Sequence, residues 1–230
     1  MFPHDRRTDY RPQLRHYVVS AEGGVTEREY FTRLRKLFWD RCNITILGKK
    51  TESAPSDVIM HANDFRGHLV DGDEIWCVCD RDRWTMEQLN ALMAWSESGE
   101  YNFVAISNPK FELWLVAHFR DLPKERFGCV EALKAYMPTY DKHIDSALIT
   151  CESVANAIAR AKEITPSTHP PLNEYGTNVW VLAEKISFKA MPTNEQLPEE
   201  NLADSGRGAD EIVQTEFSGI VDAVFSGKED

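Results

Sequence analysis

The chain has 230 residues, of which 42% are hydrophobic and 27% charged, and its formal net charge is -11. This length favours one domain with additions over two full domains. The 24 aromatic residues (6 Trp, 11 Phe and 7 Tyr) exclude a wholly disordered or collagen-like chain. No apolar run approaches the roughly 18 residues that span a bilayer, and the first residues do not resemble a secretory leader, so we expect a cytoplasmic protein that does not enter a membrane.

Charge and cysteine content refine this expectation. Residues 1–16 carry a net charge of +2, whereas residues 191–230 carry ten acidic and two basic residues, a net charge of -8. Five cysteines without a C-x-x-C pair are typical of reduced thiols in a cytoplasm rather than of disulfides or a zinc site. Cys77 and Cys79 lie two apart in a predicted strand, so we expect both to pack on one face.

The first predicted elements are a strand, a glycine turn and a helix. His16–Ala21 is a short apolar run rich in Val, which predicts a strand that ends at Glu22-Gly23-Gly24. Apolar residues with helical spacing follow Thr26, and carboxylates in the first turn favour the helix dipole. We therefore expect the first helix to begin near Thr26.

A second unit of the same kind follows. Ile44–Leu47 predicts a strand, and Ser56 is the expected cap of a helix that runs to about Leu69. Asp73–Asp80 has a continuous apolar centre, which is typical of a strand covered on both faces in a parallel sheet. It ends in Asp80-Arg81-Asp82.

The alternation of strands and helices continues with a helix over Met86–Trp95 and a strand over Asn102–Ile106. The later predicted helices are Phe111–Phe119, one that begins at Glu131–Tyr136, Val154–Ile164 and Val179–Ile186. This order predicts an α/β fold with a mostly parallel sheet flanked by helices and a helical C-terminal extension.

Four ranges describe the expected domain organisation: a basic flexible arm over residues 1–15, an α/β domain over 16–120, a helical extension packed on the core over 121–190, and an acidic linker and terminal helix over 191–230. In the last range Glu211–Phe225 has apolar residues three and four apart. We expect this segment to dock on a partner protein or shield the arm; packing on its own domain is the alternative.

Acidic residues follow two of the predicted strands. Glu22, Asp80 and Asp82 all lie at carboxyl ends of strands, where open α/β sheets bind their ligands. Carboxylates two apart at a strand end can offer hard oxygens to Mg2+ or Mn2+. The alternative is that Asp80 caps the next helix, that Asp82 is solvated and that Glu22 belongs to an ordinary turn.

Polar residues near these acids are candidates for substrate contacts. Lys110 follows the S-N-P turn and could stabilise charge on a phosphoryl group, and Ser107 and Asn108 could donate hydrogen bonds to a phosphate. A solvated lysine and ordinary turn formation before Pro109 are the alternatives.

Two arginines and a tryptophan flank the acids. Arg81, Arg83 and Trp84 could contact phosphate or stack on a base, although a solvated rim explains the arginines as well. His118 lies six residues after Glu112, on a different face of the same predicted helix, so we expect it to be a core residue and not a shared metal ligand.

Three motifs in order, E-G-G-V-T-E-x-x-Y-F, D-R-D and S-N-P-K-F-E-L-W-L-V-A-H-F, resemble the RloB family, whose core looks like a Toprim domain. The resemblance runs from about Val18 to Phe119, with a looser similarity over Gly176–Lys185. It implies that the acids at the three positions Glu22, Asp80 and Asp82 bind Mg2+.

The resemblance also implies a two-metal site. Glu27 and Glu112 are its candidate further ligands, as in the related overcoming-lysogenization-defect nucleases; for Glu27 a helix-dipole role is the alternative. In such a site the cations would activate water and stabilise the leaving oxygen of a phosphodiester. Lys110 would assist as a catalytic residue.

The family further implies a role in bacterial anti-phage defence, as an abortive-infection effector controlled by an AAA- or ABC-type ATPase encoded nearby. Its substrate would be DNA or RNA, and self-association into a homo-oligomer stays open. Two other functions compete with this one. The first is a catalytically silent Toprim-like regulatory or nucleic-acid-binding module. The second is a haloacid-dehalogenase-type phosphatase with Asp80 as nucleophile.

Overall fold

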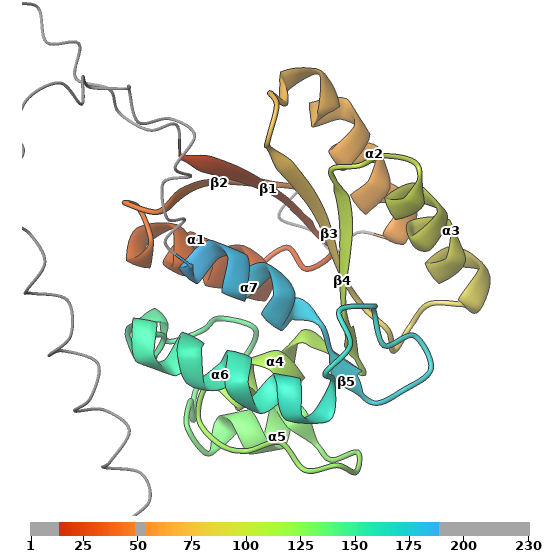
Figure 1. Cartoon of the computed structure of the whole chain (residues 1–230). Coiled ribbons are helices and arrows are strands. Elements are labelled where there is room, and N and C mark those ends of the chain that lie inside the picture. The colour runs from red at the N-terminus through yellow and green to blue at the C-terminus, as the bar shows by residue number, and fades with distance from the viewer. Residues whose placement is uncertain (1–13, 49–53, 189–230) are drawn as a thin grey trace, which may run out of the picture. The chain divides into compact units, whose positions relative to one another are not determined.

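The structure, a computed structural model, describes residues 14–48 and 54–188. Within these residues five strands form one sheet in the order β2-β1-β3-β4-β5 (Figure 1). The strands are β1 (Arg15–Ala21), β2 (Cys42–Leu47), β3 (Glu74–Asp80), β4 (Asn102–Asn108) and β5 (Gly176–Thr177). The first four run parallel, and β5 pairs antiparallel with β4. The predicted α/β fold with a mostly parallel sheet is confirmed.

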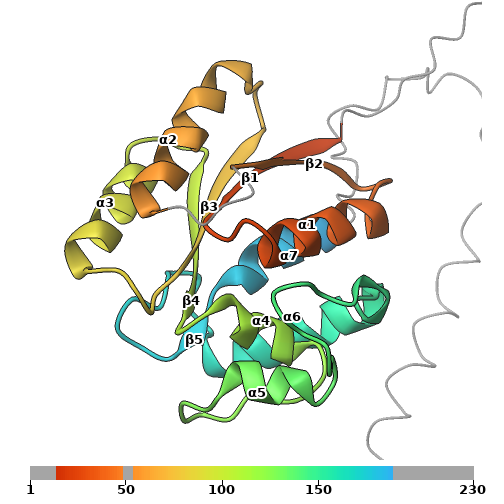
Figure 2. The same cartoon turned by 180° about the vertical axis from the view of Figure 1, so that it is seen from behind.

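Helices cover both faces of the sheet (Figures 1 and 2). They are α1 (Thr26–Leu37), α2 (Pro55–Phe65), α3 (Met86–Glu97), α4 (Phe111–Ala117), α5 (Cys129–Lys134), α6 (Cys151–Ile164) and α7 (Val179–Ser187). In both views α2 and α3 lie on one side of the strands and α1 and α7 on the other. α6 packs on α7 and α4, so the last helices extend the layer that α1 begins.

Strand β3 shows how the sheet divides two hydrophobic cores. Trp76 and Val78 pack into the core beneath α1 and α7, whereas Ile75, Cys77 and Cys79 pack into the core beneath α2 and α3. Successive side chains of a strand point to opposite faces, so a strand that is covered on both sides is apolar throughout. The prediction that the two cysteines pack on one face is confirmed.

The start of α2 corrects one prediction. The helix begins at Pro55 with Ala54 in the capping position, so Ser56 lies inside the first turn and does not cap it. The Asp57 carboxylate accepts a hydrogen bond from the Ala54 N–H at 3.0 Å. Proline is favoured at the first helical position because its missing N–H is not needed there. The helix ends at Phe65, and a 3-10 turn covers most of the remaining predicted range.

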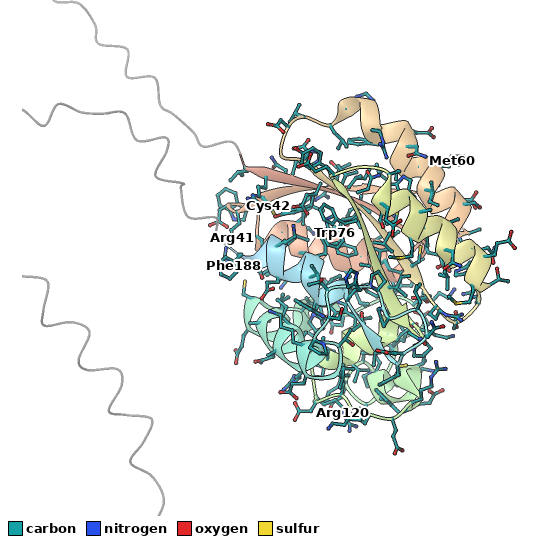
Figure 3. The ribbon with its side chains drawn as sticks, turned by 45° about the vertical axis from the view of Figure 1, so that its right-hand side comes forward. Arg41, Cys42, Met60, Trp76, Arg120 and Phe188 are labelled. Atoms are coloured by element: carbon teal, nitrogen blue, oxygen red, sulfur yellow. The ribbon has the colours of Figure 1, made fainter. Side chains whose placement is uncertain are left out.

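The last described helix returns to the first strands. Figure 3 shows Arg41, Cys42 and Phe188 lying together where α7 ends beside the start of β2. Arg41 donates to the carbonyl of Ser187, which fixes the end of the helix there. One core contains residues from β1, α4, α6 and α7, so the helices after residue 120 share their core with the sheet.

Residues 1–13, 49–53 and 189–230 lie outside the described residues, and with them nearly all of the predicted arm and the predicted acidic linker and terminal helix. All described residues belong to one compact unit. Among them, no helix has the length and apolar character needed to cross a membrane.

Candidate functional site

A pocket of about 450 Å³ opens where β1 and β3 end and where α1 and α4 begin. We call it the carboxylate pocket, because it is lined by the acids Glu22, Glu27, Asp80 and Glu112. Three basic residues also line it: Arg83, Lys110 and Lys142. Its place beyond the carboxyl ends of parallel strands is the usual ligand site of an open α/β sheet.

Asp80 reaches this pocket because of its position in β3. It is the last residue of the strand and lies on the same side as Trp76 and Val78, which face the core beneath α1. The backbone N–H of Phe111, in the first turn of α4, donates to Asp80 Oδ1 at 2.8 Å. The end of β3 therefore places the carboxylate at the pocket, and the hydrogen bond from the start of α4 fixes its position.

Glu22 follows directly after β1 and is only 4% exposed. Its Oε2 accepts hydrogen bonds from the Asp80 N–H at 3.1 Å and from the Trp84 indole N–H at 2.8 Å. A Cβ atom on Gly23 would collide with the carboxylate of Glu27. The glycine after Glu22 thus lets two acids of the first motif approach one another.

The other two acids come from helix starts. Glu27 lies in the first turn of α1 and Glu112 in the first turn of α4. The Tyr140 hydroxyl donates to Glu112 Oε1 at 2.9 Å and lies 3.2 Å from Thr26 Oγ1. Both predicted further acids therefore lie at the same pocket as Glu22 and Asp80.

Burial is the main cause of unusual acidities here. It raises the pKa of Glu22, raises that of Glu27 to about 7, and raises the pKa of Asp80 well above its ordinary value. Neighbouring acids add to the effect, with Glu27, Glu22 and Glu112 all raising the pKa of Asp80. Lys142 lowers the pKa of Glu27, but the net direction stays upward. The pocket thus concentrates negative charge that water does not fully solvate.

Asp82 takes a different direction from Asp80 and is not among the residues that line the pocket. Its Oδ2 lies 3.1 Å from Lys110 Nζ, and its Oδ1 lies 3.9 Å from Arg83 Nε. The hydrogen bond to Asp82 is the main cause of the raised pKa of Lys110. Asp82 therefore lies beside the pocket and orients the basic side chains of Lys110 and Arg83, which line it. The sequence had instead predicted Asp82 as a third metal ligand.

Two of the three predicted base or phosphate contacts, Arg81 and Trp84, direct their polar groups away from a substrate and toward other parts of the protein. The Arg81 side chain donates from Nε to the carbonyl of Leu172 at 2.6 Å and from Nη1 to that of Trp84 at 2.9 Å. Trp84 directs its indole N–H to Glu22. Arg83 lines the carboxylate pocket. Of the three, only Arg83 is placed where a pocket-bound phosphate would lie.

Ser107 and Asn108 are the last residues of β4 and are buried. Ser107 Oγ lies 2.8 Å from Thr177 Oγ1 of β5, and the Asn108 side chain donates to the Pro171 carbonyl at 3.2 Å. Neither residue lines the carboxylate pocket. These contacts hold the segment around β5 beside β4, so the two residues have a structural position instead of the predicted phosphate contact.

His118 is a core residue, as predicted. It is buried, and its Nδ1 lies 3.1 Å from the Trp114 carbonyl and its Nε2 3.3 Å from the Tyr30 hydroxyl. Burial lowers its pKa to about 4, so the ring stays neutral at pH 7.

Sequence reasoning missed the segment Tyr140–Ile144, which we call the strap. Thr26 Oγ1 donates to the Lys142 carbonyl at 2.7 Å, and Lys142 lines the pocket. Lys142 has a φ of 94°, a left-handed conformation that is costly for a residue with a side chain. No glycine or apolar period marks this turn, and its contacts with Thr26 and Glu29 are with residues more than 100 positions away, so no local signal could have identified it.

The donor set suits a hard divalent cation. In the part of the chain that the structure describes, no three His, Cys, Asp or Glu side chains stand close enough together to hold a metal ion as placed. Mg2+ commonly uses only one or two carboxylates and completes its shell with water and substrate phosphate. Glu22 and Asp80, joined through the backbone of Asp80, therefore fit an open Mg2+ or Mn2+ site but not a closed cage.

A family model described as RloB-like protein matches residues 17–186, which is more than half of the chain and contains the whole carboxylate pocket and the strap. Neither the curated proteins nor the solved structures gave a match. The match agrees with the resemblance carried by the three motifs, whose acids Glu22, Glu27, Asp80 and Glu112 meet in one pocket. The chain belongs to the RloB-like family.

Proposed function

We propose that this chain is a Mg2+-dependent nuclease with a Toprim-like core, which hydrolyses phosphodiester bonds of DNA or RNA. One observation supports this function most strongly. Four acids from the ends of β1 and β3 and the starts of α1 and α4 line one pocket, and the pKa of three of them is raised. Such a concentration of poorly solvated carboxylates favours binding of a cation.

Glu22 and Asp80 would hold the first cation, because the N–H groups of Trp84 and Phe111 already orient them. A bound Mg2+ or Mn2+ would polarise a phosphoryl oxygen and lower the pKa of an attacking water. Glu27 and Glu112 line the same pocket and would hold a second ion. The surrounding N–H groups fix the acids before the substrate arrives, which is what preorganised catalysis requires.

Basic residues at the pocket would bind the substrate phosphate. Arg83, Lys110 and Lys142 line the same cavity as the four acids. Lys110 Nζ lies 3.1 Å from Asp82 Oδ2, which fixes the lysine side chain. The Thr26 hydroxyl fixes the backbone of Lys142 through a hydrogen bond to its carbonyl. A phosphodiester between these cations and the bound metal would have its negative charge neutralised from both sides.

The biological role is part of the same proposal and is supported by the family alone. Membership of the RloB-like family favours an effector of bacterial anti-phage defence that acts in the cytoplasm with a partner ATPase of the AAA or ABC type. The outcome for the cell would be abortive infection.

One observation favours a second candidate, a catalytically silent regulatory or nucleic-acid-binding module. No three metal-binding side chains among the described residues are already gathered around one point. A module that binds nucleic acid without cutting it needs the basic residues but not a complete metal site.

Cleavage assays separate these functions. We expect the full chain to cut labelled DNA or RNA oligonucleotides in Mn2+ or Mg2+, to stop in EDTA, and to lose cleavage in Glu22→Gln and Asp80→Asn. Binding without cleavage under all metal conditions would support the silent module. Release of phosphate from p-nitrophenyl phosphate, with a phosphorylated Asp80, would support the phosphatase alternative.

A further inference from the structure

A second pocket of about 450 Å³ lies along α1. We call it the basic groove and define it by the residues Arg28, Thr32, Arg33, Lys36, His143 and Ser146. The first four lie on α1, and the other two follow the turn at Lys142. Arg28, Arg33 and Lys36 line this groove on α1, although the chain as a whole has a net charge of -11. The groove is therefore a positively charged patch on an acidic protein.

The one acid that lines this groove, Glu29, is engaged by the strap. Its Oε1 lies 2.7 Å from His143 Nδ1, and its Oε2 accepts the Ile144 N–H at 2.9 Å. The contact with Glu29 raises the pKa of His143, which favours a positive ring. Glu29 is therefore used for holding the strap, and the groove keeps its positive character from Arg28, Arg33 and Lys36.

Both arginines of the groove are held in place by hydrogen bonds. Arg33 donates from Nε to the Ile149 carbonyl at 2.8 Å, and Arg28 donates from Nη2 to the Gly48 carbonyl at 2.5 Å. Each of these bonds uses one of the five N–H donors of a guanidinium group. Arg28 Nε is buried and has no hydrogen-bond partner among the described residues. Anchored guanidinium groups lose less freedom when they bind an anion.

The basic groove adjoins the carboxylate pocket. Lys142 lines the pocket and the next residue, His143, lines the groove. On α1 the same division separates Glu27, which lines the pocket, from Arg28, which lines the groove. Consecutive residues of α1 and of the strap thus line the two depressions, which places these depressions next to each other.

We infer that the basic groove binds the phosphodiester backbone of a nucleic-acid strand whose reacting phosphate lies in the carboxylate pocket. The inference rests on the proposed nuclease function and extends it to the class of substrate. Arginine and lysine contacts to phosphate carry no sequence information. Because the groove and the carboxylate pocket are separate depressions, a substrate that occupies both is a polymeric strand several nucleotides long, held by its backbone, and not a mononucleotide or a small phosphate ester.

Binding of oligonucleotides tests this inference without relying on cleavage. The experiment uses the full chain carrying Glu22→Gln, EDTA, and fluorescein-labelled single-stranded DNA and RNA of twelve nucleotides, with fluorescence anisotropy recorded between 50 and 200 mM salt. In this background we expect Lys36→Glu and Arg33→Gln each to weaken binding by about fivefold to tenfold. The slope of log affinity against log salt should fall by about 0.7 to 1 for each lost phosphate contact.

Lys134→Glu supplies the matched control, since Lys134 is exposed on α5 and lines neither depression. Arg33→Gln removes a bond to Ile149, whereas Lys36 is exposed, so Lys36→Glu separates lost affinity from lost folding. Unchanged affinity in both groove variants, an equal loss in Lys134→Glu, or no binding at 50 mM salt would overturn the inference.

The same variants, made without the Glu22 change, keep the two proposals distinguishable. If the chain binds strands through the groove but never cuts them in Mn2+, the proposed nuclease function is contradicted and the proposal for the basic groove stands. If the chain cuts strands while the Lys36→Glu and Arg33→Gln variants bind them normally, only the proposal for the basic groove is contradicted.

Discussion

Acidic residues lie at both ends of strand β3, but their surroundings differ. At the amino end, Glu74 accepts the Trp76 indole N–H at 3.0 Å and pairs with Lys185 Nζ at 2.7 Å. Asp73, which precedes the strand, lies 3.2 Å from His16 Nδ1 and accepts the Val70 N–H at 3.1 Å. Each of these acids has its own partners, as buried carboxylates in a stable core require.

At the carboxyl end the acids are neighbours of one another. Asp80 and Glu22 accept N–H groups, yet burial and the adjacent carboxylates still raise the pKa of both. Folding would not gain stability from gathering such groups. The comparison teaches that an acid with a dedicated basic partner serves the fold, whereas acids gathered together indicate a site for a charge that comes from outside.

Removing acids at the two ends should give opposite results, and this is the largest effect we expect. Glu22→Gln or Asp80→Asn should lower cleavage more than about 100-fold, since even outer-shell partners of a metal contribute about 10- to 100-fold. Glu74→Gln should leave the cleavage rate unchanged but lower the free energy of unfolding by about 1 to 3 kcal/mol, because Lys185 and Trp76 lose an ionised partner. Cleavage rates and urea unfolding measure the two quantities.

Thermal melts are the control for this comparison. Without metal, Glu22→Gln should melt no lower than the original chain, because the amide oxygen can still accept the Trp84 N–H while the charge is gone. A large fall in melting temperature in Glu22→Gln, with normal cleavage by the folded fraction, would show that this end of β3 is structural too.

The metal-free protein should lose stability as pH rises. Glu27 has a folded-state pKa of about 7 against an ordinary value of 4.5. The folded state therefore holds the proton more tightly, so the contribution to stability is complete below pH 4.5 and is lost as pH rises through 7. At about 1.4 kcal/mol per pH unit, the free energy of unfolding should fall by about 3 kcal/mol.

Urea unfolding in EDTA at several pH values measures this dependence. Burial also raises the pKa of Glu22 and Asp80, which contribute in the same direction. Glu27→Gln should flatten part of the profile. A profile that Glu27→Gln leaves unchanged would contradict the assignment of the pH dependence to this pocket.

Asp82 should matter less than Asp80, although both stand in D-R-D. Asp82 contacts Lys110 and does not line the pocket, so Asp82→Asn should lower cleavage by only about tenfold, as expected for a residue that acts through another. The loss should appear mainly in KM, because Lys110 would bind substrate phosphate less well. Equal and large losses of kcat in Asp82→Asn and Asp80→Asn would show that both acids hold the metal.

The sequence was sufficient for the four parallel strands and for the core of the site. Apolar runs such as Asp73–Asp80 predict strands, and parallel strands bring their carboxyl ends together, so Glu22 and Asp80 could be expected at one edge. The same reasoning could not separate Asp82 from Asp80. Its direction depends on the turn after β3, where the Asp82 N–H donates to the Pro109 carbonyl at 3.1 Å.

Other features depend on contacts that no local pattern contains. Tyr140 and Lys142 reach Thr26 from 114 and 116 residues away. Ser107 and Asn108 resemble a turn before proline, but pairing with β5 keeps them in strand β4. Two-residue strand β5 is too short to show any period. Such tertiary contacts override local signals.

Crystals of the full chain grown with Mn2+ would test the central claim most directly, because anomalous diffraction locates the ion. We predict a Mn2+ ion in the carboxylate pocket, with oxygens of Glu22 and Asp80 within about 2.5 Å and water completing its shell. The acids at the amino end of β3, Asp73 and Glu74, should bind none. An empty carboxylate pocket at millimolar Mn2+, or an ion at Asp73 and Glu74 instead, would contradict the account.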